Sequence, residues 1–151
     1  MKKIFVFILM AAAMLTASCV FESENDAVYE ISLGTTSYSV GGTNPAGVAY
    51  QAAEEVKAQV RDFSQHYLSQ WVCTYTSNNT FRQQESDAVL KWEEALAAFQ
   101  KIHDSFVTKY GSTPSDGSTY ECTYKLYLKR HDPDKGDDTV RQSDGFLFEV
   151  E

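Results

Sequence analysis

The sequence predicts an α+β domain of two layers, in which two antiparallel helices cover one face of a small antiparallel sheet. Two long segments, 47–72 and 86–110, place apolar residues every three or four positions, which is the period of an amphipathic helix. Two segments near the C-terminus, 120–130 and 139–150, alternate apolar and polar residues, as strands do when one face is buried. Because the apolar stripe of a helix must be buried against another element, the helices are expected to lie on the sheet. With a first strand at 27–33, the predicted order is β-α-α-β-β.

The first strand is predicted over 27–33 because every second residue there is apolar. The triplet Gly34-Thr35-Thr36 indicates a bulge or a tight turn after it, and 41–47 is typical of a loop. Asn44 and Pro45 are expected to begin the first helix, as its cap and its first residue. The apolar stripe of this helix consists of Ala49, Ala52, Val56, Val60, Phe63, Tyr67 and Trp71.

The second helix is predicted to begin at a cap on Ser86 and to end before Gly111, a residue that favours helix C-termini. Between the helices, residues 71–75 either finish the first helix or form a short extended segment, and 76–86 is polar. The stripe of the second helix consists of Val89, Trp92, Leu96, Phe99, Ile102, Phe106 and Tyr110.

The last two strands are predicted to form a hairpin, with a turn over 131–138 and the first strand along one edge. Inward-facing residues are expected at every second position of both strands. These residues are Tyr120, Cys122, Tyr124, Leu126 and Leu128 on the outgoing strand, and Phe146, Phe148 and Val150 on the returning strand.

The N-terminus has the pattern of an export signal. Lys2 and Lys3 precede an apolar run that is too short for a membrane span, which needs about 20 residues, and small residues follow it. Three parts are therefore predicted: a signal peptide over 1–18, an acidic tether over 19–26 and one globular α+β domain over 27–151.

The segment Leu15-Thr16-Ala17-Ser18-Cys19 resembles the lipobox of bacterial lipoproteins of the Bacteroidota type, with Thr16 where many lipoboxes have leucine. This resemblance covers only the signal segment and the acidic residues that follow it. It implies that Cys19 carries a lipid such as palmitate, because two or more acyl chains hold a protein at a membrane. It also implies the outer membrane, on the cell surface or the periplasmic side. The alternative is ordinary secretion without a lipid.

Acidic residues outnumber basic ones, and the net charge is −8. A nucleic acid is therefore not expected as a partner, since binding it requires a basic surface. Attraction to anionic headgroups is not expected either, so the predicted membrane partner is reached through the lipid alone. A protein or a glycan remains as a further partner, and no cofactor is expected.

The three cysteines are Cys19, Cys73 and Cys122. If Cys19 is lipidated, the other two are free to form a disulfide in the oxidising compartment outside the cytoplasm. The sequence predicts a Cys73–Cys122 bridge, against the alternative of two buried thiols.

The turn over 131–138 concentrates carboxylates, which are ligands that calcium prefers. The order of an EF-hand loop is not met, so no metal is predicted and the four residues are weak candidates: Asp132, Asp134, Asp137 and Asp138. The three histidines, His66, His103 and His131, show neither an i, i+4 pair nor a His-Glu-x-x-His motif. No nucleophile elbow occurs, and no catalytic residue is predicted.

The open face of the sheet is the candidate binding surface. If the helices cover one face, the other presents Lys125, Tyr127 and Lys129 from one strand and Leu147 from its neighbour. With Arg130, the lysines would form a positive patch on an acidic protein, and the apolar side chains would be anchors of the kind that interfaces favour.

The sequence therefore predicts a lipid-anchored exported lipoprotein whose domain is a non-enzymatic binding module. Two alternatives stay open: a small hydrolase or metal-dependent enzyme, and an inhibitor or immunity-type protein.

Overall fold

The protein is seen in a computed structural model that describes residues 27–68, 70–73 and 78–151, with the backbone alone for 71–73 and 78–83. The predicted signal peptide, the tether and the lipid site at Cys19 lie outside the described residues. The elements are β1 (Ala27–Gly42), α2 (Val48–Tyr67), β2 (Gln70–Cys73), α3 (Asn78–Tyr110), β3 (Ser118–Asp132), β4 (Gly136–Gln142) and β5 (Phe146–Val150).

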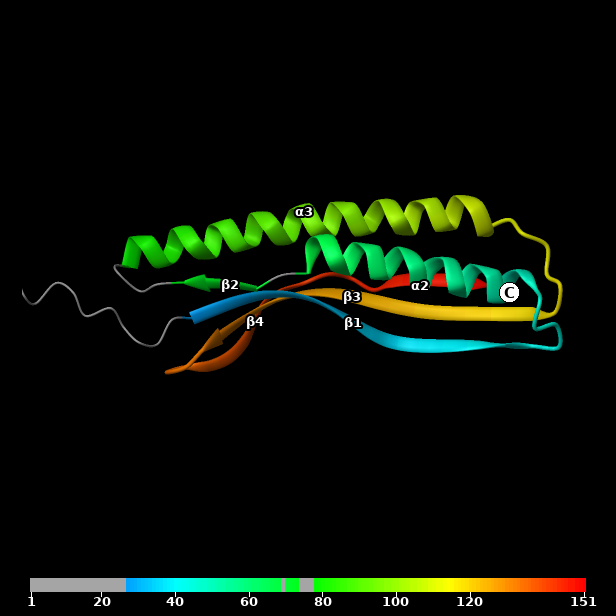
Figure 1. Cartoon of the computed structure of the whole chain (residues 1–151), viewed down its shortest axis with the longest axis horizontal. Helices are drawn as coiled ribbons and strands as arrows, with labels where there is room; N and C mark the ends of the chain where they lie inside the picture. The colour runs from blue at the N-terminus through cyan, green and yellow to red at the C-terminus, as the bar shows by residue number, and fades with distance from the viewer. Residues whose placement is uncertain (1–26, 69, 74–77) are drawn as a thin grey trace, which may run out of the picture.

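The fold has two layers, and the predicted α+β class is confirmed. The strands form one antiparallel sheet in the order β2-β1-β3-β4, and β5 also pairs with β3. Figure 1 shows α2 and α3 running in opposite directions on the same side of this sheet. Neither helix combines the length and the apolar composition that crossing a membrane requires.

The order of elements differs from the prediction in two places. The short strand β2 follows α2, so 71–73 is extended, as one of the two alternatives predicted, and the rest of 71–75 lies outside the described residues. The predicted returning strand is divided into β4 and β5, which pair with successive parts of β3. The division occurs at Ser143, whose backbone N–H donates to the Leu126 carbonyl while its hydroxyl accepts the Leu126 N–H, both at 2.9 Å.

Several predicted boundaries are also wrong. β1 continues to Gly42 because Thr36 forms a bulge and not a turn, so the strand bends and goes on pairing with β3. α3 begins at Asn78, eight positions before the predicted cap at Ser86, since no glycine or proline interrupts the segment between them.

The first helix is capped not by Asn44 but by Asp116 and Ser118, which are 68 and 69 residues from the N–H groups that they accept. α2 begins at Val48, whose N–H donates to the Asp116 carboxylate at 2.9 Å, and the Ala49 N–H donates to the Ser118 hydroxyl at 3.1 Å. These are N–H groups that a helix leaves without a partner in its first turn. A Cβ at Gly47 would lie 2.3 Å from the Ser118 hydroxyl, so only glycine permits this close approach.

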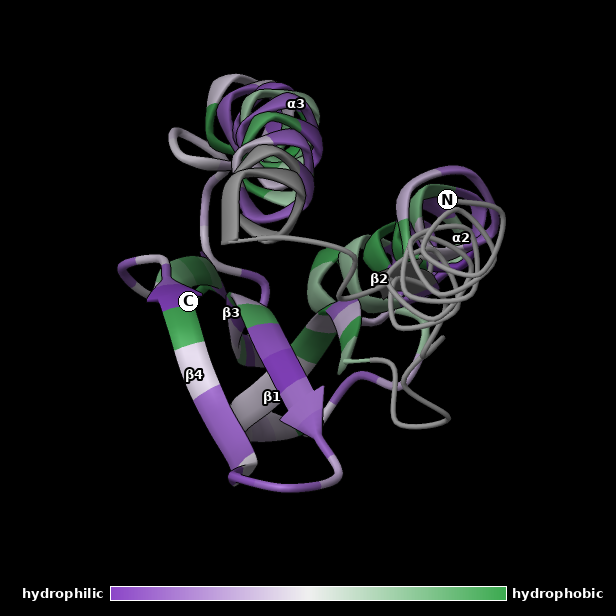
Figure 2. Ribbon diagram, turned by 90° about the vertical axis from the view of Figure 1, so that its left-hand side faces the viewer, coloured by the Kyte–Doolittle hydropathy of each residue, from purple (hydrophilic) through white to green (hydrophobic). Residues whose placement is uncertain are grey.

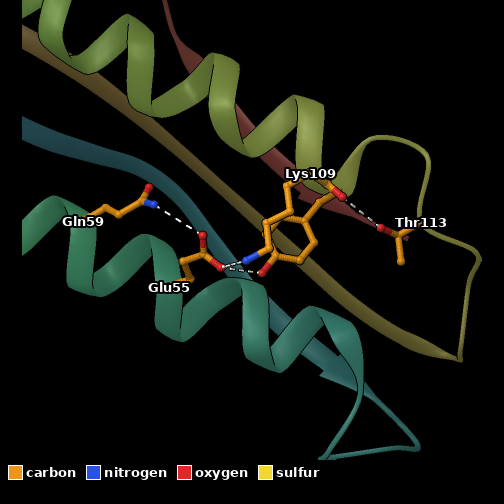
Figure 3. Close-up of polar contacts among 5 residues, drawn as sticks. Glu55, Gln59, Lys109 and Thr113 are labelled. Carbon is orange, nitrogen blue, oxygen red and sulfur yellow. Dashed lines mark hydrogen bonds and ion pairs between the residues drawn. The ribbon is translucent and has the colours of Figure 1, made fainter.

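A polar cluster joins α2 to the C-terminal end of α3. The Glu55 carboxylate of α2 accepts hydrogen bonds from the Lys109 ammonium and, at 2.7 Å, from the Tyr110 hydroxyl (Figure 3). Gln59 donates to the other oxygen of Glu55 at 3.4 Å. The hydrogen bond from Lys109, followed by that from Tyr110, holds the pKa of Glu55 below its ordinary value. The cluster therefore fixes the two helices against each other.

The centre of the core is Phe99, which is fully buried between the helices and the sheet. Its ring meets the ring of Phe63 on α2 at a centroid distance of 4.9 Å. On the sheet side it meets Phe146 at 5.1 Å, Tyr124 at 5.9 Å and Phe148 at 6.0 Å. These contacts are edge-to-face, an arrangement that adds about 0.5–1.5 kcal/mol per pair beyond area burial.

Candidate functional site

The helices leave one face of the sheet open, as Figures 1 and 2 show. The four predicted residues are together on this face. Lys125, Tyr127 and Lys129 alternate with the buried residues of β3, and Leu147 lies on β5, opposite Thr123. The side chain of Leu147 is 43% exposed. The alternation of the strand was therefore sufficient to place these residues on one surface.

Tyr127 is held on the face by a residue that the sequence reasoning missed. Gly34 lies beside it on β1, and a Cβ at Gly34 would be 2.9 Å from the edge of the Tyr127 ring. The ammonium of Lys129 lies 5.6 Å from the centre of the same ring, within the range of a cation–π contact. The ring is thus fixed between Gly34 and Lys129 rather than free in solvent. The isolated glycine in an otherwise regular strand was the available signal, because such glycines often mark a close approach.

The two lysines of this face have no carboxylate partner among the described residues. The ion pairs of the described chain involve other cations. Lys125 and Lys129 are partly buried, and four residues of strand place their Cα atoms about 13 Å apart. Glu30 lies opposite Lys129 in the register, but its carboxylate contacts His131, so an acidic partner that spans this surface would meet two cations outside the salt bridges of the described residues.

Arg130 does not belong to this patch, contrary to the prediction. It pairs with the buried Tyr29 in the sheet register, so it is on the side of the helices. Its guanidinium donates to Asp138 at 2.6 Å. The positive part of the open face is therefore limited to Lys125 and Lys129.

A triad of charged side chains, Glu30, His131 and Asp137, lies at one end of the open face. The His131 ring contacts Glu30 through Nε2 at 2.8 Å and Asp137 through Nδ1 at 3.0 Å. The hydrogen bond to Glu30, and then that to Asp137, raises the pKa of His131. Since the carboxylates approach opposite sides of the ring, the triad is an ion-pair network rather than a set of ligands around one point. Glu30 is 101 residues away in sequence, so spacing could not reveal this contact.

The three histidines do not meet. The His66 ring contacts the Asp62 carbonyl at 2.8 Å within α2, and His103 of α3 contacts the Leu147 carbonyl at 2.8 Å. His131 lies in the triad on the open face. In the part of the chain that the structure describes, no three histidine, cysteine or acidic side chains are placed to hold a metal ion.

The aspartates of the 131–138 turn also have separate roles. Asp132 is buried and accepts the N–H groups of Asp134 and Lys135 at 3.0 and 3.1 Å, which shapes the turn. Asp137 contacts His131, and Asp138 contacts Arg130. The carboxylates are therefore used to build the hairpin.

The predicted Cys73–Cys122 disulfide is wrong. Cys122 is a buried free thiol. The sheet register places Cys73 opposite Ala27 and Cys122 opposite Tyr38, near the two ends of β1. At about 3.3 Å per residue, roughly 30 Å of sheet separates the two cysteines, whereas a disulfide requires Cα atoms within about 7 Å. The side chain of Cys73 lies outside the described part.

Two concave surfaces lie on the helix side. A groove of about 770 Å³ separates α2 from α3, with Phe63 and Ile102 among its lining residues. A smaller cleft of about 400 Å³ separates α3 from the segment between β4 and β5. It includes Trp92, whose buried indole nitrogen has no hydrogen-bond partner among the described residues.

Comparison with protein-family models, with curated proteins and with solved structures found no match.

Proposed function

We propose that this chain is an exported lipoprotein that a lipid on Cys19 holds at the outer membrane, and that its folded domain is a non-enzymatic binding module. The lipobox-like segment and the acidic residues after it support the anchor. The cell surface and the periplasmic side are both compatible with this proposal. The bound partner is a protein or a glycan that carries acidic groups.

The open sheet face carries the proposal. Lys125 and Lys129 flank the fixed ring of Tyr127, and neither lysine is in an ion pair of the described residues, although Glu30 lies opposite Lys129 in the register. Desolvated aromatic rings and charge complementarity are what specific interfaces use for affinity and orientation. On a chain with a net charge of −8, two uncompensated cations beside a fixed ring favour an acidic partner.

The test compares two double variants of the full-length chain in expressing cells. Lys125→Ala with Tyr127→Ala removes the candidate binding groups, and Lys101→Ala with Tyr67→Ala removes the same residue types from the helix groove. Cross-linking on intact cells reports protein partners, and retardation in native gels that contain an acidic polysaccharide reports glycans. The first variant is expected to lose the interaction and the second to keep it. Equal behaviour of both variants and the wild type would contradict the assignment to this face.

A further inference from the structure

The second half of β1 is an open edge of the sheet. β2 pairs with β1 only from Ala27 to Glu30, whereas β3 pairs with the other side of β1 as far as Gly42. Among the described residues, no strand covers the outer side of β1 from Ile31 onwards. In Figure 1 this part of β1 forms the lower margin of the right-hand half of the molecule. Its backbone N–H and C=O groups on that side are available to another strand.

The other edges of the sheet are protected. β2 contains only four residues. β4 carries charged side chains at Asp137, Asp138 and Arg141, and Figure 2 shows it as largely hydrophilic. On β5, the backbone carbonyl of Leu147 contacts Nε2 of His103 at 2.8 Å and so already has a partner. Short strands, charges and covered backbone groups are the devices by which proteins prevent pairing between edges.

The open edge has only one such device. Residues 32–42 include no charged side chain and no proline, although the chain as a whole has a net charge of −8. The bulge at Thr36 interrupts the edge, but a regular segment of five residues, 37–41, follows it before Gly42, whose φ is 112°. An uncharged edge on an acidic protein is a margin where two copies could approach without repulsion between like charges, and among the described strands it is longer than the uncharged edge of β2.

Tyr38 shows that the helices do not cover this edge. It is paired with the buried Cys122, so it is on the helix side of the sheet, and its ring lies 6.2 Å from that of Tyr120. Nevertheless Tyr38 is 63% exposed, more than any other exposed large hydrophobic residue of the described chain. α2 therefore leaves space beside the edge, and an apolar ring is present in that space.

We propose that the segment 37–41 of β1 pairs with the same segment of a second copy of this chain, which forms a symmetric antiparallel dimer with one continuous sheet. A twofold axis brings identical surfaces together, so an edge without charge is complementary to itself. Five paired residues supply about four to six backbone hydrogen bonds, at the low end of the range of 10 ± 5 that a typical interface carries. The open face remains free for the partner proposed above.

The alternation of faces limits the register. Residues that lie directly opposite in a sheet point to the same side, and Tyr38 and Val40 both point to the helix side, opposite Cys122 and Tyr120. Axes at Tyr38, Ser39 and Val40 all satisfy this condition, and the axis at Ser39 is the one that places Tyr38 of one copy opposite Val40 of the other. The exposed ring of each copy is then covered by its partner.

The first experiment adds one cysteine to the full-length chain, which is tested in the membranes of expressing cells. Ser39→Cys places two thiols opposite each other, at a Cα distance of about 5 Å that a disulfide can bridge. Mild oxidation is expected to give a reducible band of twice the mass. Leu147→Cys, exposed on the opposite edge, and the chain without an added cysteine are the controls and are expected to give no such band.

The second experiment measures the protein mass of the full-length chain in detergent by light scattering over a concentration series. Two copies are expected for the wild type and one for Tyr38→Lys, which puts a charge on the edge, with an unchanged circular dichroism spectrum. Ser39→Lys, which points to the open side, is expected to act in the same way and serves if Tyr38→Lys does not fold. A wild type with the mass of one copy throughout the series, or folded lysine variants that remain dimers, would overturn the proposal.

Discussion

The cap that Asp116 and Ser118, the first residue of β3, provide for α2 gives the sharpest prediction for folding. Ser118→Ala removes the hydroxyl that accepts the Ala49 N–H at 3.1 Å and that also donates to Asp116. Ser118 is 1% exposed, so water cannot replace the lost acceptor. A buried donor without a partner costs about 1–3 kcal/mol, and loss of a helix cap costs about 0.5–2 kcal/mol. Because both numbers describe the same event, the expected loss is about 2 kcal/mol and not their sum.

Urea unfolding of the full-length chain, followed by circular dichroism, measures this loss. A decrease of about 2 kcal/mol corresponds to about 8 °C in the unfolding temperature of a domain of this size. Ser112→Ala is the matched control, since Ser112 is exposed on the same loop and is expected to change stability by less than about 0.5 kcal/mol. If Ser118→Ala unfolds at the same urea concentration as Ser112→Ala, the reasoning about the long-range cap is refuted.

Three further predictions concern the core and the charged clusters. Phe99→Ala is expected to lose about 3–5 kcal/mol in the same urea assay, because the ring joins both helices to the sheet; a loss below 1 kcal/mol would place the core elsewhere. Glu55→Gln is expected to lose about 1 kcal/mol at neutral pH, a value reduced by the exposure of the pair. Since the pKa of Glu55 is lowered from 4.5, the stability that Glu55 contributes is present above pH 4.5 and is lost as the pH falls through the lowered pKa. Glu55→Gln should not show this loss of stability. The pKa of His131 is raised from 6.5, so the stability that His131 contributes is complete below pH 6.5 and is lost as the pH rises through the raised pKa. Titration of the ring by NMR should show a pKa above 6.5 that returns toward it in Glu30→Gln, and an unchanged pKa there would argue against the triad.

The sequence was informative where a pattern reports a local preference. The helical period of three and four residues placed Phe63 and Phe99 in the core, and the alternation in β3 placed Lys125 and Tyr127 on the open face. Both patterns depend on which side of an element is buried, and that is decided within the element itself.

Contacts between distant segments could not be read from the sequence in the same way. Ser118 caps a helix 69 residues earlier, and Glu30 reaches His131 over 101 residues, since the sheet register and not the spacing brings them together. The disulfide prediction failed for this reason: the apolar position of Cys122 was recognised, but its distance from Cys73 depends on register. The start of α3 was missed because a polar segment was interpreted as a loop, although nothing in it terminates a helix.

The most direct test of the account is the intact mass and the N-terminal residue of the chain purified from a bacterium that exports it. The proposal predicts a mature protein that begins at Cys19 and that exceeds its polypeptide mass by a diacylglycerol group, with or without a further acyl chain. The same measurement on Cys19→Ser should show no added lipid. A native chain that begins at another residue, or that has the mass of the bare polypeptide, would contradict the claim that this domain is a lipid-anchored binding module.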